Sequence, residues 1–228
     1  MWRSAHVNLK SYNPFVTFLS LLILTFAFSF TFNLVITLCL LCLIWIALLF
    51  TGVFIGAFLK VNGIALFLGT TLFIGTFIWG KSPYQFLLSF TVASRPLVFM
   101  AAGLLFHTSH SSYDFIESLQ QNAKLPSHFT YGLFAVFNLV SLIQLQYQRN
   151  RLAFRLRGYR VMALSPKLML SLLFKTIYWV DHLEIAMVSK GFHPQHSRTH
   201  TIEYHITTKD HIFLAISILL SLVMMLYP

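Results

Sequence analysis

Long apolar runs separated by short polar breaks dominate the first half of the chain. Residues 15–32, 34–50 and 61–79 contain no charged side chain, and Asn33 separates the first two runs. Each run is close to the roughly 20 residues that an α-helix needs to cross the hydrocarbon core of a bilayer. We therefore predict that the three runs are packed membrane helices. A cleaved signal peptide is the alternative for the first run, but further spans follow it and no small-residue cleavage site is evident.

Two further apolar segments predict additional crossings. Residues 85–93 and 97–106 together are long enough for a span, with a tilt or kink at Arg95-Pro96, because proline removes a hydrogen bond inside a helix. Residues 212–227 form a shorter span near the end of the sequence. The predicted fold class is an all-α membrane protein with about five transmembrane helices and a cytoplasmic helical coupling domain of long amphipathic helices.

Composition and charge divide the chain into unlike parts. Of its 228 residues, 57% are hydrophobic and only 10% are charged, against about 25% charged residues in soluble domains. All six acids and eleven of the sixteen bases lie between His107 and His211. We expect a transmembrane helical domain at 1–107, cytoplasmic coupling helices at 108–198, and a linker with a C-terminal transmembrane helix at 199–228.

The distribution of bases predicts the orientation in the membrane, because Lys and Arg are retained on the cytoplasmic side. Arg3 and Lys10 lie on the same side of the membrane as the bases of the polar insert if four crossings separate them. We therefore expect a multi-pass protein of the cytoplasmic membrane, with a cytoplasmic N-terminus and Lys60 in an inside loop. Arg95 has two open interpretations, a functional intramembrane charge or a side chain that reaches the interface.

The polar insert contains two long predicted helices. The first covers about residues 127–157; the second begins at Ser165-Pro166, a cap followed by proline at the first helical position, and ends near Lys190. In the first helix, polar and apolar residues recur in steps of three and four on separate faces, as an amphipathic helix requires. The polar positions are Ser141, Gln144, Gln148, Arg151 and Arg155, and the apolar ones are Val136, Val140, Ile143 and Tyr147.

The two helices end in the same way. A base, a glycine and an aromatic residue follow one another at Arg157-Gly158-Tyr159 and again at Lys190-Gly191-Phe192, with 33 residues between the bases. Glycine is a common left-handed cap, and a cation in the last turn stabilises a helix by about 0.3 to 1 kcal/mol. The spacing alone leaves both a capping role and a functional role open.

The sequence around these ends resembles a known family. Thr108-Ser109 with Asp114-Phe115-Ile116 is similar to its threonine-rich, acidic helix start, and Lys124-Leu125-Pro126 to its turn. Ala153 precedes the first arginine-glycine pair, and residues 181–192 follow the form Asp-x-Leu-x-x-Ala-Met-x-x-Arg-Gly-aromatic. The chain thereby resembles the transmembrane T component of energy-coupling factor importers, a family that includes the membrane subunit of the cobalt transporter.

The resemblance implies a coupling role for the two helix ends, each docking into a groove of one ATPase subunit. The residues that match the family's motifs are Leu156, Arg157 and Gly158 in the first and Ser189, Lys190 and Gly191 in the second. Lysine stands where the family has arginine in the second motif. Lysine keeps the charge but lacks the planar fork that binds a carboxylate with two hydrogen bonds, so we expect unequal docking.

The resemblance also implies the partners. They are two ABC ATPase subunits, which bind the ATP, a substrate-binding membrane protein called the S component, and the lipid membrane of a prokaryote. Nucleic acid is not among them, and the chain is expected to be non-catalytic and to hold no cofactor. The cargo, a vitamin or a transition metal, stays open. Candidate S-component contacts are the exposed faces of the long helices and the small residues Gly52, Gly56, Gly69 and Gly75, for which ordinary helix packing is the alternative.

Other classes of function remain as alternatives. A histidine-containing membrane metal-binding protein is suggested by His193, His196, His200 and His205, although their spacing matches no recognised ligand set. A stand-alone permease should carry polar groups through several spans or show an internal repeat, whereas the first three runs contain no charged residue. A membrane enzyme should show a pattern such as H-E-x-x-H or G-x-S-x-G, and neither occurs. Cys39 and Cys42 lie within an apolar run, where buried thiols are expected.

Overall fold

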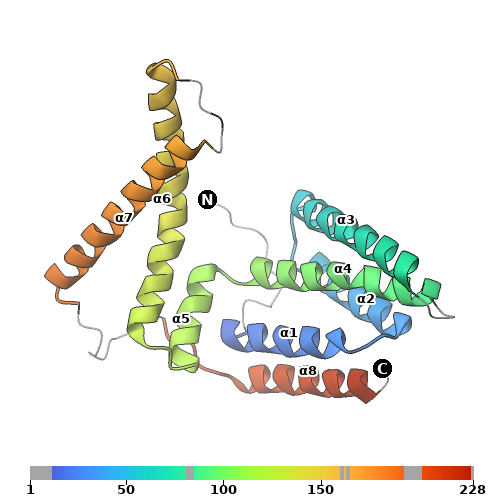
Figure 1. The fold of residues 1–228 in the computed structure, drawn as a ribbon. Helices are drawn as coiled ribbons and strands as arrows, with labels where there is room; N and C mark the ends of the chain where they lie inside the picture. The colour runs from blue at the N-terminus through green and yellow to red at the C-terminus, as the bar shows by residue number, and fades with distance from the viewer. Residues whose placement is uncertain (1–11, 81–84, 160–161, 163–164, 193–201, 227–228) are drawn as a thin grey trace. The chain divides into compact units, whose positions relative to one another are not determined.

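Every regular element that the structure describes is an α-helix (Figure 1). The structure is a computed structural model, and it describes residues 12–80, 85–159, 162, 165–192 and 202–226. The chain divides into two compact units, which we call the bundle (Met1–Asn122 with Glu203–Pro228) and the helix pair (Ala123–Ile202). The prediction of an all-helical fold is confirmed.

Six helices form the bundle, and asparagine side chains start two of them. The helices are α1 (Pro14–Ser29), α2 (Leu34–Phe50), α3 (Ile55–Trp79), α4 (Gln85–Ser109), α5 (Ser112–Asn122) and α8 (Thr208–Leu226). The side chains of Asn13 and Asn33 accept hydrogen bonds from the backbone N–H groups of Phe15 and Val35, both at 3.0 Å. Each asparagine thus satisfies a donor that the helix itself leaves free. The predicted break at Asn33 is confirmed.

The core of the bundle lies around α4, which packs against α1, α2 and α3. Phe28, Leu48 and Val98 are almost completely buried there. Small residues bring α3 and α4 together, because a Cβ atom on Gly69 would lie only 2.5 Å from the carbonyl oxygen of Ala93. Gly69 therefore serves helix packing inside the bundle. This was the alternative to an S-component contact for this glycine.

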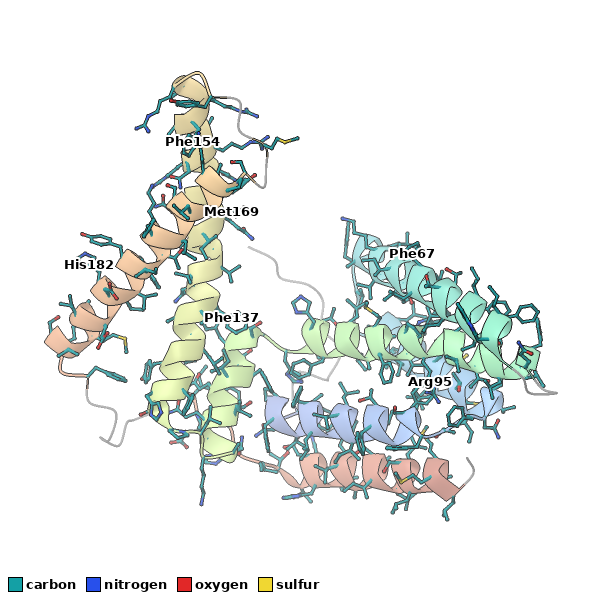
Figure 2. All side chains as sticks on the ribbon, in the orientation of Figure 1. Phe67, Arg95, Phe137, Phe154, Met169 and His182 are labelled. Atoms are coloured by element: carbon teal, nitrogen blue, oxygen red, sulfur yellow. The ribbon has the colours of Figure 1, made fainter. Side chains whose placement is uncertain are left out.

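Arg95 lies on α4 beside the end of α1 (Figure 2). Its Nη2 donates a hydrogen bond to the carbonyl oxygen of Thr31 at 3.0 Å, and its guanidinium lies 4.6 Å from the ring centre of Phe32. The carbonyl belongs to the turn between α1 and α2, where helix ends leave acceptors unpaired. Arg95 therefore joins this turn to α4, and α4 continues through Pro96 to Ser109.

Four helices are long and apolar enough to cross a membrane, namely α3, α4, α8 and α6 (Ser127–Leu156) of the helix pair. The protein is therefore membrane-associated. The apolar helices α1 and α2 are shorter, with 16 and 17 residues, and α6 belongs to the segment that we expected on the cytoplasmic side. The number of crossings consequently stays a prediction. Lys60 lies within α3, so the expected loop at this residue is wrong.

The helix start expected at Thr108-Ser109 is also wrong. Both residues belong to the last turn of α4, and their hydroxyls donate to the carbonyl oxygens of Leu104 and Leu105. Such bonds let Ser and Thr stay inside a helix. The next helix, α5, begins at Ser112 and packs on the bundle, where the ring of Phe115 lies 4.9 Å from that of Phe18.

The helix pair consists of α6 and α7 (Pro166–Ser189), which contact each other over a short stretch. Ser165 occupies the N-cap of α7 and Pro166 its first position, as predicted from the sequence. Few residues of these helices are buried: Thr130, Asn150, Leu168 and Leu172. The pair is therefore held together by a small contact and exposes most of its surface.

Candidate functional site: two helix tips and the contact between their helices

The end of α6 is a closed left-handed turn. Gly158 has a φ of +79°, and its N–H donates to the carbonyl oxygen of Arg155 at 2.9 Å. The N–H of Tyr159 reaches back to the carbonyl oxygen of Phe154 at 3.0 Å. A bond of this span, from the second residue past the cap, defines the Schellman motif, which needs glycine at the left-handed position. Arg157 is the capping residue itself.

The end of α7 repeats this geometry residue for residue. Gly191 has a φ of +78°, its N–H donates to Val188 at 2.9 Å, and the N–H of Phe192 donates to Met187 at 3.0 Å. Lys190 is the capping residue. We call Leu156–Gly158 the first tip and Ser189–Gly191 the second tip. The two tips have the same backbone, so they differ only in their side chains and surroundings.

The tips are exposed, and their charges are unequal. Leu156 retains 89% of its surface, and all six tip residues are exposed. The last two turns of α6 carry Arg149, Arg151 and Arg155 before Arg157, and the sequence has no acid between Glu117 and Asp181. The second tip follows Asp181 and Glu184 on its own helix. The first tip is therefore a strongly basic surface, whereas acids partly offset the charge near the second.

The second tip borders a groove. A cavity of about 580 Å³ lies between the first half of α6 and the last half of α7, and Lys190, Gly191 and Phe192 are among its lining residues. The ring of Phe192 meets that of Tyr131 edge-on at 5.2 Å. This contact fixes the aromatic residue after the glycine against α6.

A polar contact joins the two helices where they meet. Lys175 of α7 donates to the side-chain oxygen of Asn150 at 2.8 Å and to that of Gln146 at 3.3 Å, both on α6. Asn150 is buried and donates in turn to the hydroxyl of Ser171 at 3.3 Å. Hydrogen bonds of this kind fix the register of two helices more sharply than apolar contacts, since an unpaired buried amide is costly. We call these four residues the polar crossing.

Sequence reasoning found the two tips but not the polar crossing. The two tips follow a repeated sequence motif. No such motif links the residues of the polar crossing, which are Gln146, Asn150, Ser171 and Lys175. Of the apolar row expected on α6, Ile143 lines a cavity between the helices, but Val136 and Val140 are half exposed. The only signal for the crossing is that polar residues follow one another at a four-residue step, Gln146 to Asn150 and Ser171 to Lys175.

The sequence suggested a metal site at four histidines and burial of two cysteines, and the structure bears on each separately. His193, His196 and His200 lie outside the described residues, and His205 pairs with Glu203 at 2.8 Å. In the described ranges no group of three potential ligands surrounds a metal site. Cys39 and Cys42 are free and exposed on α2, so the expected burial of these thiols is wrong.

The arrangement presents two exposed cationic residues, Arg157 and Lys190, each at the end of a helix. A comparison of the chain with protein-family models finds no match, and a comparison with curated proteins finds none either. The geometry that bears on function is therefore two helix ends with the same backbone conformation, 33 residues apart, on two exposed helices joined by the polar crossing.

Proposed function

We propose that this chain is the transmembrane coupling subunit of an ATP-driven importer of a vitamin or transition metal. In this proposal it links two ABC ATPase subunits to a separate substrate-binding membrane protein, in the cytoplasmic membrane of a prokaryote with its N-terminus in the cytoplasm. The chain is non-catalytic, and ATP is bound by its partners. The observation that supports the proposal is the pair of tips with the same backbone, each presenting one exposed cation.

The physical reason is that a rigid projection transmits movement. The hydrogen bonds of each Schellman turn hold the terminal cation in a fixed position relative to its helix. When two ATPase subunits close on ATP, each displaces the helix end that it holds, and the polar crossing keeps the two helices in register. Two equivalent ends suit a motor with two equivalent or related subunits.

The two docking contacts are expected to be unequal. Arg157 offers a planar guanidinium to a carboxylate, with further arginines beside it, whereas Lys190 offers a single ammonium. Loss of Arg157 should therefore cost more binding than loss of Lys190. Charge-assisted pairs at the centre of an interface are often worth about 2 kcal/mol or more, about 30-fold in affinity.

Co-purification with the ATPase subunits tests this proposal. The tagged chain is isolated from native membranes in mild detergent, and the recovered material is assayed for ATP hydrolysis inhibited by vanadate. We expect Arg157→Ala to lower recovered ATPase at least about tenfold, Lys190→Ala to lower it less, and the double variant to abolish it. Lys60→Ala, which removes an exposed base of the bundle, is the control. Unchanged recovery by the double variant refutes the coupling role, and equal losses refute the inequality.

A further inference from the structure

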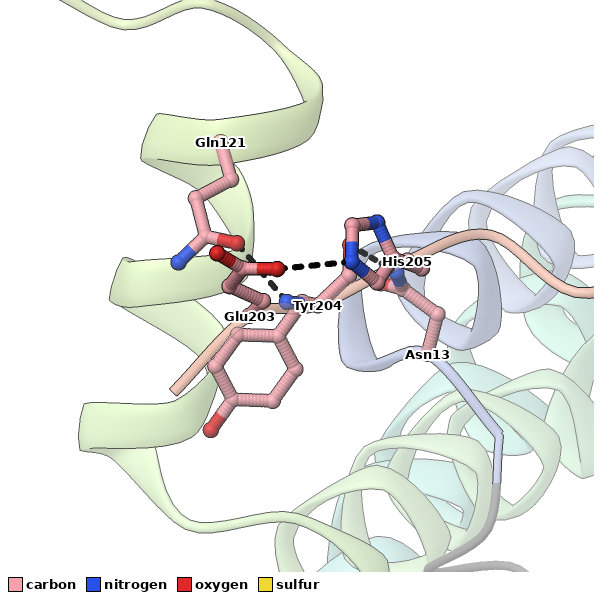
Figure 3. Close-up of polar contacts among 5 residues, drawn as sticks. All are labelled: Asn13, Gln121, Glu203, Tyr204 and His205. Atoms are coloured by element: carbon pink, nitrogen blue, oxygen red, sulfur yellow. Dashed lines mark hydrogen bonds and ion pairs between the residues drawn. The ribbon is translucent and has the colours of Figure 1, made fainter. Parts of the chain in front are cut away.

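Both chain connections of the helix pair meet a single polar cluster in the bundle. Asn122 is the last bundle residue before the pair, and Glu203 is the first one after it. The cluster contains side chains from α5 and the start of α1, together with the segment before α8 (Figure 3). Any displacement that the pair transmits along the backbone therefore enters the bundle at this cluster.

Tyr204 joins the two connections directly. Its backbone N–H donates to the side-chain oxygen of Gln121 at 2.7 Å, and its phenol donates to Oδ1 of Asp114 at 3.0 Å. Both acceptors are on α5, about two helical turns apart. The returning segment is thereby fixed to α5 at two points, so it cannot pivot about one bond.

Asn13 and Asp210 extend the cluster to α1 and α8. The side chain of Asn13 donates to the carbonyl oxygen of Tyr204 at 3.2 Å, and its backbone N–H donates to Oδ1 of Asp210 at 2.9 Å. Asp210 is fully buried, and its Oδ2 accepts from the N–H and hydroxyl of Thr207 at 2.8 and 2.7 Å. A buried carboxylate that lost these donors would be strongly destabilised, so the contacts hold α1, α8 and the returning segment as one piece.

We propose that Tyr204 is a positioning residue of the coupling path, which clamps the returning segment to Asp114 and Gln121 so that movement of the helix pair displaces α1, α5 and α8 together. This inference rests on the proposed coupling function. Without the phenol contact to Asp114, the segment before α8 keeps one bond fewer to α5, and movement that reaches α5 through Asn122 is passed less completely to α8. The clamp acts on the path of movement and makes no contact with the ATPase.

The phenol is suited to a permanent contact. Burial and the hydrogen bond to Asp114 raise the pKa of Tyr204 above its usual value. The hydroxyl thus stays a donor across the physiological range, and the clamp does not switch with pH. The strength of the clamp depends on the position of the Asp114 carboxylate. A substitution at Asp114 can remove this acceptor while α5 stays folded.

Hydrogen exchange of the assembled complex tests the clamp. The full chain with its co-purified ATPase subunits is placed in lipid nanodiscs, and amide exchange is followed before and after addition of a non-hydrolysable ATP analogue. In the wild type we expect a nucleotide response both at 186–192, which covers the second tip, and at 208–214 of α8. Tyr204→Phe should keep the response at 186–192 and lower that at 208–214 about fivefold, the effect of losing one hydrogen bond.

Three further variants separate positioning from general stability. Asp114→Asn keeps an oxygen acceptor and should keep the α8 response, whereas Asp114→Ala should lose it. Tyr178→Phe removes an exposed phenol hydroxyl from α7 and should behave as wild type. A full α8 response in Tyr204→Phe overturns the clamp, as does a wild type that responds at 186–192 alone. A wild type silent at 186–192 overturns the proposed coupling function itself.

Discussion

Different interactions stabilise the bundle and the helix pair, each within itself. In the bundle, Phe28, Leu48 and Val98 are surrounded on all sides, and the helices touch along their lengths. Among the described residues of the helix pair, the buried apolar side chains are Leu168 and Leu172, and a polar crossing fixes the register. Phe174 and Leu156 retain 63% and 89% of their surface. The bundle has a packed apolar core and the pair has almost none, although both leave large apolar side chains exposed, among them Leu49 and Trp79 in the bundle.

In the proposed coupling role, the helix pair receives the force and the bundle resists deformation. Close packing around Phe28, Leu48 and Val98 makes this core resist deformation, because a buried side chain there cannot move without displacing its neighbours. The pair has few apolar contacts, so the angle between its helices depends on the polar crossing. In the proposed coupling role, force on the tips therefore acts on the polar crossing before it distorts the packed core of the bundle.

The largest expected effect comes from replacing one phenylalanine by alanine in each of the two units. Phe28→Ala empties a fully buried site in the bundle, and we expect the free energy of unfolding to fall by about 3 kcal/mol. Phe174→Ala, on the exposed side of α7, should change it by less than about 0.5 kcal/mol. Denaturant titration of both purified variants in detergent measures the two values. Equal losses would show that the pair has a core as dense as that of the bundle.

The next effect concerns the polar crossing. Lys175→Met keeps much of the side-chain length but leaves the amide of Asn150 without its charged donor, which should cost about 2 kcal/mol. The change is expected to free the angle between α6 and α7, measured as a broader distance distribution between spin labels at positions 152 and 185. Lys60→Met, which replaces an exposed lysine of α3 in the bundle, is the matched control and should leave the distribution unchanged. A narrow distribution in Lys175→Met would remove the crossing from the proposed mechanism.

Sequence patterns predicted the elements that depend on local signals. Asn33, Ser165-Pro166, Gly158 and Gly191 mark helix boundaries because each satisfies or breaks backbone hydrogen bonds within a few residues. Contacts between distant residues left no such pattern. Nothing near Tyr204 in the sequence indicates Asp114 or Gln121, and Thr108-Ser109 resembled a helix start although both hydroxyls bond within α4. The tips were thus predictable, whereas the clamp and the polar crossing required the structure.

A smaller effect tests whether the two tips share one backbone state. Gly158→Ala and Gly191→Ala should each cost about 1 kcal/mol, because alanine is strained at a positive φ and no neighbouring atom adds a clash. Gly132→Ala, in the middle of α6 with open space around it, should instead stabilise by up to about 1 kcal/mol. Thermal unfolding of the three variants provides the comparison. A cost at one tip only would mean that the other turn is not held in the left-handed conformation.

The smallest effect is the dependence of the clamp on pH. The folded-state pKa of Tyr204 is raised, so its contribution to stability is complete below the unfolded-state pKa of about 10 and declines only as the pH rises further. The difference in unfolding free energy between wild type and Tyr204→Phe should therefore be constant from about pH 7 to about pH 9, and should narrow only at higher pH. Denaturant titrations across this range measure the difference. If the difference narrows already near neutral pH, a group other than the phenol controls the contact, and Tyr204 would not be the residue that ties the returning segment to α5.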